Sequence, residues 1–163
     1  MKTLITTTLL YFFALVASPV TAQVWSQWEK DNSIGQFGSF LVIKQPEANP
    51  AFCYIKQSYE DIPRKMDLGM TPDRVPYLTH PFFRGIDGDL VYQVDNGPLR
   101  SINSADIRPS FPIDLNKKIT SELISGRKLH LRFRPKNYTN IHQELPLDGF
   151  GESLEKIDSQ VCK

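Results

Sequence analysis

The clearest pattern in the chain is the alternating stretch Lys128-Leu129-His130-Leu131-Arg132-Phe133-Arg134. Successive side chains of a β-strand point to opposite faces, so the apolar residues share one face and the basic residues share the other. We therefore predict a strand whose apolar face packs on a core. Its other face, with Lys128, His130, Arg132 and Arg134, is predicted to meet solvent.

Three other segments also predict strands. Residues 38–44 and 51–57 are short runs of β-branched and aromatic residues bounded by turn formers. Residues 89–95 alternate in polarity, which places Leu90, Tyr92 and Val94 on one face. Residues 95–98 (Asp-Asn-Gly-Pro) then predict a turn, because Asn and Gly tolerate the positive φ that a tight turn requires.

Two short helices are predicted in the second half of the chain. The first has an N-cap candidate, two apolar residues four positions apart and a glycine stop: Asp114 or Asn116, Ile119 and Leu123, and Gly126. The second begins at Asp148 as its cap and has one apolar stripe, made of Phe150, Leu154, Ile157 and Val161. Twelve prolines keep the strands short and disfavour a long helix. The predicted fold class is all-β, an antiparallel β-sandwich with one or two short helices, including a C-terminal helix.

Composition narrows the class of protein. The 163 residues are 40% hydrophobic, 11% aromatic and 23% charged, and the formal net charge is +1. These values exclude collagen, a coiled coil and a mostly disordered chain, and the length fits one domain. The near-zero charge gives no reason to expect nucleic acid as a partner.

The first 22 residues have the layout of a secretory signal peptide. Lys2 is followed by an apolar run from Leu4 to Ala17, and then by Ser18, Pro19 and small residues that end at Ala22. The alternative is a membrane anchor, but the run is shorter than the ~20 residues that span a bilayer. We therefore predict a periplasmic or secreted protein with a single β-sandwich domain at residues 23–163 and no transmembrane segment after signal removal.

Export determines how the two cysteines are interpreted. In an oxidising compartment two thiols usually pair, and Cys53 and Cys162 are the only candidates in the sequence. We predict a disulfide between them. The alternative is two free thiols, one in a strand and one near the C-terminus.

No pattern in the sequence predicts catalysis, a cofactor or a metal site. His80, His130 and His142 lie in three different segments, without the spacing that zinc ligands usually have. No Gly-x-Ser-x-Gly nucleophile motif and no Gly-rich phosphate loop occurs. We therefore expect a protein that is not an enzyme, with no catalytic, cofactor-binding or metal-binding residues.

The basic face of the alternating strand is the predicted partner-binding surface. His130, Arg132 and Arg134 gather there, and arginine suits bidentate contacts with phosphate or carboxylate. The expected partner is a protein or an anionic surface component. The alternative is a solvated face whose charges pair with Glu144 or other acids on neighbouring strands. The aromatic residues within 77–83 are a second possible contact surface, or the edge of the core.

Several segments occur in an order typical of one family. They are Trp25 and Trp28 in a first strand, Cys53-Tyr54-Ile55-Lys56-Gln57, Gly85-Ile86-Asp87-Gly88, Tyr92-Gln93-Val94-Asp95, the strand Arg127 to Phe133, and Leu145-Pro146-Leu147-Asp148-Gly149-Phe150-Gly151-Glu152-Ser153-Leu154. In these features the chain resembles the invasion-associated locus B family of exported bacterial proteins. The resemblance covers nearly all of residues 23–163.

The resemblance implies a periplasmic or secreted β-sandwich linked to host-cell colonisation, without established enzymatic activity or cofactor. We therefore expect an exported, non-enzymatic binding or accessory protein. The alternative is a periplasmic inhibitor or immunity-type protein that blocks a toxin or a cell-wall enzyme.

Overall fold

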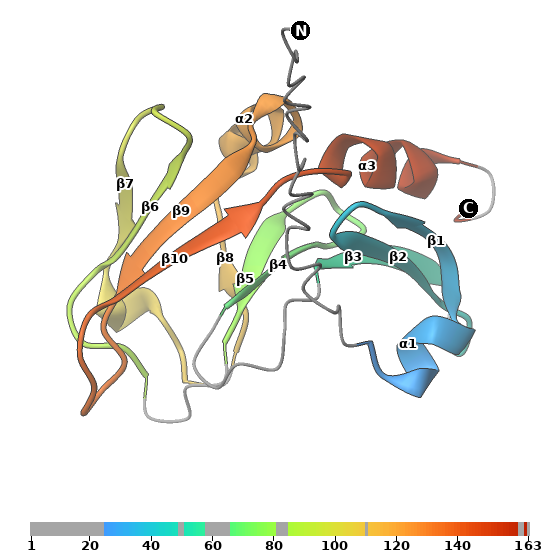
Figure 1. Cartoon of the computed structure of the whole chain (residues 1–163). Helices are drawn as coiled ribbons and strands as arrows, with labels where there is room; N and C mark the ends of the chain where they lie inside the picture. The colour runs from blue at the N-terminus through green and yellow to red at the C-terminus, as the bar shows by residue number, and fades with distance from the viewer. Residues whose placement is uncertain are drawn as a thin grey trace, which may run out of the picture.

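The computed structural model describes residues 25–48, 51–57, 66–80, 85–109, 111–159 and 162. The predicted signal peptide lies outside the described residues, as do residues 81–83 of the aromatic segment and Val161. Within the described ranges, ten strands form two antiparallel sheets, and short helices lie at their ends and faces (Figure 1). The predicted sandwich-like all-β fold is confirmed.

The larger sheet has six strands in the order β1-β2-β3-β4-β5-β8. Their bounds are Ser33–Phe37 (β1), Phe40–Gln45 (β2), Phe52–Gln57 (β3), Asp67–Met70 (β4), Pro76–Thr79 (β5) and Ile113–Asp114 (β8). The strands predicted at 38–44 and 51–57 are confirmed as β2 and β3. These two strands pair along their whole length, with Phe40 opposite Gln57 and Gln45 opposite Phe52.

The smaller sheet has four strands in the order β10-β9-β6-β7. Their bounds are Leu90–Val94 (β6), Arg100–Ile102 (β7), Lys128–Phe133 (β9) and Ile141–Pro146 (β10). Burial alternates along β9 as predicted, since its three apolar residues are buried and the residues between them are half-buried or exposed. The alternation predicted for 89–95 is confirmed in β6, where Leu90, Tyr92 and Val94 are buried.

Both sheets and the last helix contribute to one apolar core. The helices and 3-10 turns are Gln27–Asp31 (α1), Ser104–Asp106 (η1), Lys117–Ile119 (η2), Thr120–Ser125 (α2) and Phe150–Asp158 (α3). Helix α3 packs against β1, β2 and β3, as Figure 1 shows. Its Phe150 is fully buried and meets Phe40 edge to face, with ring centroids 5.2 Å apart. The predicted C-terminal helix therefore closes the core.

The first predicted helix is confirmed in its capping and its buried face. The Asn116 side chain accepts a hydrogen bond from the Lys118 N–H at 3.0 Å, which caps η2, and α2 follows directly. Ile119 and Leu123 are fully buried, and Gly126 is the C-cap of α2. The segment is therefore a 3-10 turn that continues into a short α-helix.

The prediction that Asp148 caps the last helix is wrong. The N-cap of α3 is Gly149 in the left-handed conformation, with φ +83°. A Cβ at this position would lie 2.1 Å from the carbonyl oxygen of Phe37, so the backbones of two turns meet here without room for a side chain. Asp148 instead accepts a hydrogen bond from the Ser39 hydroxyl at 3.1 Å. The two turns are thereby fixed to each other.

The prediction of a first strand around Trp25 and Trp28 is also wrong, because Ser26 starts a helix. Its hydroxyl accepts from the Glu29 N–H at 3.2 Å, and the Glu29 carboxylate accepts from the Ser26 N–H at 2.8 Å. This reciprocal pair is a capping box, which satisfies backbone donors at a helix start. Trp25 packs with Leu41 on the side of β2 away from the main core.

Two long-range connections join distant segments. Cys53 on β3 forms a disulfide with Cys162, beyond α3, with their Cα atoms 5.5 Å apart. The buried Gln143 side chain on β10 accepts from the Met66 N–H at 2.8 Å and donates to the Met66 carbonyl at 2.7 Å. This amide links the two sheets. In the described part of the chain, no helix has the length and hydrophobicity that a membrane crossing needs.

Candidate functional site

The basic residues of β9 lie side by side with polar residues of β10. In the register of the two strands, His130 is opposite Glu144 and Arg132 is opposite His142. Paired residues of an antiparallel sheet project from the same face, so these four side chains share the outer surface of the smaller sheet. The grouping of His130 and Arg132 that the sequence predicts is therefore present in the structure.

Much of the charge on this face is paired within the protein. Lys128 Nζ lies 2.6 Å from one Glu144 oxygen, and His130 Nδ1 lies 3.3 Å from the other. The hydrogen bond and charge of Lys128 lower the pKa of Glu144. Arg134 Nε is 3.9 Å from an Asp87 oxygen. The charge pairing considered as the alternative for this face is thus present at three of its four basic residues.

Arg132 differs from its neighbours. It is exposed and forms no ion pair with any described residue, because its cross-strand neighbours are Val91 and His142. Together with Leu99, which is 65% exposed, these residues line a shallow hollow of about 170 Å³. The Arg132 guanidinium, beside a hollow lined by both apolar and polar side chains, is the group that this face offers to an acidic partner.

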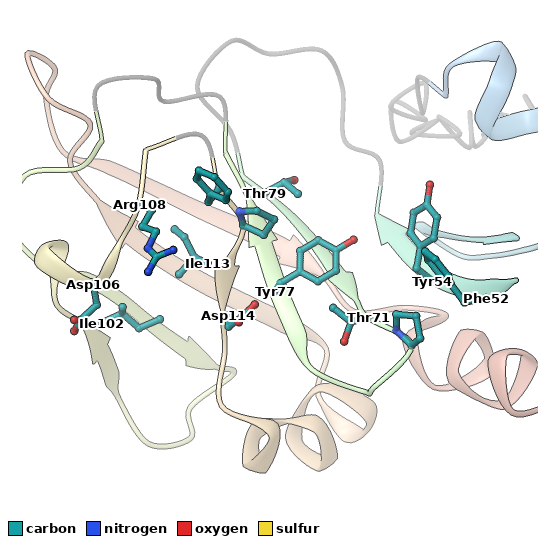
Figure 2. A pocket seen from close by; sticks show the side chains of 13 residues that line it. Phe52, Tyr54, Thr71, Tyr77, Thr79, Ile102, Asp106, Arg108, Ile113 and Asp114 are labelled. Carbon is teal, nitrogen blue, oxygen red and sulfur yellow. The ribbon is translucent and has the colours of Figure 1, made fainter. Parts of the chain in front are cut away.

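A larger hollow, of about 780 Å³, lies on the outer face of the larger sheet (Figure 2). We call it the aromatic groove. It is lined by aromatic rings, prolines and aliphatic side chains, with threonines and charged residues among them: Phe52, Tyr54, Thr71, Pro72, Tyr77, Thr79, Ile102, Asp106, Arg108, Phe111, Pro112, Ile113 and Asp114. In Figure 2 the Tyr77 ring lies in the middle, between Tyr54 on one side and Asp114 on the other.

The register of the sheet builds the floor of the groove. Gly69 on β4 is opposite Lys56 on one side and Tyr77 on the other, and Tyr77 is in turn opposite Asp114. A Cβ on Gly69 would lie only 2.3 Å from Cζ of Tyr77. The tyrosine ring therefore lies directly on the glycine of the neighbouring strand, and a larger residue there would displace it.

The surface next to the groove is covered. Trp25, which precedes α1, packs against Leu41 and Ile43 on β2, and Tyr54 at the groove's edge packs against this cluster. Lys56 forms an ion pair with Glu29 of α1, which holds its ammonium on the α1 side. The aromatic groove is thus the part of this sheet face that α1 and Trp25 leave open.

The tyrosines of the groove are neutral at physiological pH. Burial, with smaller contributions from Tyr54 and Asp67, raises the pKa of Tyr77 to about 12. Burial also raises the pKa of Tyr54, and the negative charge of Glu29 adds to the effect. Both side chains therefore offer a ring face and a phenolic O–H for contact rather than a reactive phenolate.

The described residues hold no group of three or more His, Cys, Asp or Glu placed to bind a metal ion. His80 is half-buried, and burial lowers its pKa. What the groove offers chemically is stacking, hydrogen bonding and charge.

From the sequence, only the aromatic segment that begins at Tyr77 could be predicted as a possible contact surface of the groove. The glycine within β4 was the missed signal, because glycine in a strand often marks a close approach.

No known protein family matches this sequence, and neither does any curated protein. Among solved structures, the fold is similar to that of invasion associated protein B from Bartonella henselae, with a TM-score of 0.57. The match covers 76% of this chain and 94% of that protein, at 19% sequence identity. This similarity shows a related fold.

Proposed function

We propose that this chain is an exported, non-enzymatic binding protein that contacts its partner through the aromatic groove. The observation that carries the proposal is the hollow itself, where several aromatic rings and prolines line a solvent-accessible surface. Clustered apolar surface open to solvent is typical of interaction sites. Aromatic residues are also enriched in protein interfaces.

Separate observations support the proposed compartment and the proposed process. The disulfide and the predicted signal peptide favour the periplasm or the cell exterior, where disulfides persist. The fold likeness to an invasion associated protein supports a role in host-cell colonisation. If the partner is instead a toxin or a cell-wall enzyme, the protein is an inhibitor or immunity-type protein that uses the same groove.

A second contact surface is the basic outer face of β9, with His130, Arg132 and Arg134 as the binding residues for an acidic partner. The specific observation in its favour is Arg132, which forms no ion pair with a described residue. Replacing Arg132 and Arg134 by serine should change stability by less than about 0.5 kcal/mol, as is usual for surface positions. Capture of an acidic partner would weaken if this face is used.

Site-specific photo-crosslinking in the producing cell tests which surface makes contact. A photoreactive phenylalanine replaces Phe111 in the groove, and Tyr138 in the β9–β10 turn is the matched control. Both wild-type side chains are exposed, by 60% and 48% respectively. A third probe at His142 reports on the basic face.

We expect one discrete crosslinked product from position 111 and none from position 138. The product should disappear when Thr79→Arg places a long side chain in the groove. Equal crosslinking from 111 and 138, or a product that Thr79→Arg leaves unchanged, would contradict the groove as the contact site. A product from position 142 alone would assign contact to the basic face.

A further inference from the structure

The charges around the aromatic groove point to the chemistry of its partner. Asp114 and Asp106 are exposed and form no ion pair with a described residue, while Arg108 is the cation among the described lining residues. Lys56 is the nearest other cation in the same cross-strand row, and Glu29 already neutralises it. Asp67 on β4 adds a negative field at Tyr77. The described surface near Tyr77 is therefore net negative.

Tyr77 and Asp114 lie on neighbouring strands, with the tyrosine ring over Gly69 on one side of β5 and Asp114 on the other side. The two residues are direct cross-strand neighbours on the same face of the sheet. Cβ atoms of such pairs lie about 5 Å apart. A ring face attracts a cation, and an adjacent carboxylate adds an ion pair to the same group. The side chain of a lysine or arginine is long enough to lie along the Tyr77 ring and reach toward this carboxylate.

The extent of the groove indicates an extended ligand. Its lining runs from Phe52 and Tyr54 on β3, across β5 and β8, to Ile102 on β7 and Asp106 on η1, as Figure 2 shows. Thr71 and Thr79 place hydroxyl groups along this path, and these can bond a peptide backbone. Grooves lined by aromatic side chains are one of the recurring surfaces that bind extended peptide segments.

We propose that the aromatic groove binds an extended peptide segment of the partner that carries lysine or arginine, whose cation lies over Tyr77 beside Asp114. This proposal rests on the groove being the contact site. It predicts that affinity depends on the charge of one peptide side chain. It also predicts that the effect of that charge depends on Asp114.

The test uses three blocked peptides of the form Gly-Pro-X-Tyr-Gly-Pro-Gly, in which X is lysine, norleucine or glutamate. Each is titrated into the ¹⁵N-labelled protein, purified from the periplasm of an expression host, and followed by NMR up to millimolar concentration. Asp114→Asn is the test variant. Asp89→Asn, at another exposed aspartate outside the groove, is the matched control.

We expect the lysine peptide to shift the amide signals of Tyr77 and Asp114 and to bind about tenfold more tightly than the norleucine peptide. Asp114→Asn should weaken binding of the lysine peptide roughly threefold and leave binding of the norleucine peptide unchanged, since an exposed ion pair adds little affinity. Asp89→Asn should change neither affinity.

Equal affinities for the lysine and norleucine peptides would overturn the charge preference while leaving the groove as a contact site. Groove signals that respond to a neutral oligosaccharide such as chitohexaose, and to none of the peptides, would overturn a peptide partner in favour of a glycan. If neither peptide nor oligosaccharide shifts any groove signal, the proposal fails. The crosslinking at position 111 then decides separately whether the groove is used at all.

Discussion

Replacing Phe150 by alanine is expected to detach α3 from the larger sheet. The side chain is fully buried and packs edge to face against Phe40, with ring centroids 5.2 Å apart. Loss of a buried phenylalanine typically costs about 3–5 kcal/mol, because transfer energy is lost and a cavity remains. The edge-to-face pair places the expected value in the upper part of that range, since such pairs add roughly 0.5–1.5 kcal/mol.

The loss is large against the ~5–15 kcal/mol of a typical domain, and it corresponds to a fall in Tm on the order of 10–20 °C. Urea unfolding without reductant measures it, because the disulfide stays intact and linear extrapolation gives the free energy of unfolding. Ile124→Ala, at a residue of α2 that is 50% exposed, is the control and should cost less than about 1 kcal/mol. A Phe150→Ala loss below about 1 kcal/mol with an unchanged m-value would refute this account of the core.

Three further predictions concern the disulfide, a turn and a buried acid. Cys53 and Cys162 are 109 positions apart. Replacing both by serine should lower the free energy of unfolding by up to ~4.7 kcal/mol, and an unchanged urea midpoint would contradict this. Gly149→Ala should cost more than ~2 kcal/mol, because it adds a backbone clash to the left-handed strain. Gly88 also has a positive φ, +70°, but a Cβ there would meet no atom within 4 Å. Gly88→Ala should therefore lose only the stability that the strained backbone costs. Equal losses of stability in the two variants would refute the clash at Gly149. Burial raises the pKa of Glu29, but Lys56 and Ser26 lower it more, so its net pKa lies below 4.5. Its stabilisation is therefore present above pH 4.5 and lost as pH falls through the folded-state pKa, and Glu29→Gln should flatten the pH dependence of the urea midpoint.

Elements defined by local periodicity could be predicted from the sequence. The alternation at 128–134 gives β9 its buried and exposed sides, and the spacing of Phe150, Leu154 and Ile157 gives the buried stripe of α3. These patterns can be recognised in the sequence because each element packs a single apolar face against the core. The Cys53–Cys162 disulfide was predicted from the count of cysteines and the inferred compartment, and the structure contains it.

Features that depend on contacts between distant segments could not be predicted in the same way. Gly149 replaces Asp148 as the helix cap because the backbone at Phe37, over a hundred positions earlier, leaves no room for a side chain. The strand expected at Trp25 is wrong for a local reason, since Ser26 and Glu29 form a capping box that starts a helix.

At the candidate site, too, local patterns could be predicted and contacts between strands could not. Sequence alternation grouped His130 with Arg132 and offered Glu144 as a pairing partner for this face. It could not show that Glu144 pairs with Lys128 and His130, while Arg132 forms no ion pair with a described residue. The aromatic groove needs the register that sets Tyr77 on Gly69 and beside Asp114. Register comes from pairing between strands, which no single segment of the sequence specifies.

The junction of the two turns at Gly38 and Gly149 affects how this protein can be engineered. A Cβ at either glycine would lie within 2.3 Å of backbone atoms of the other turn. Grafted epitopes, affinity tags or fluorescent labels placed in either turn would therefore push the β1–β2 hairpin away from α3. The side chains of the turn at residues 136–140, between β9 and β10, are all exposed, and the Lys136 N–H at its start donates to the Gly85 carbonyl. This turn is the position where foreign sequence can be displayed with the scaffold intact.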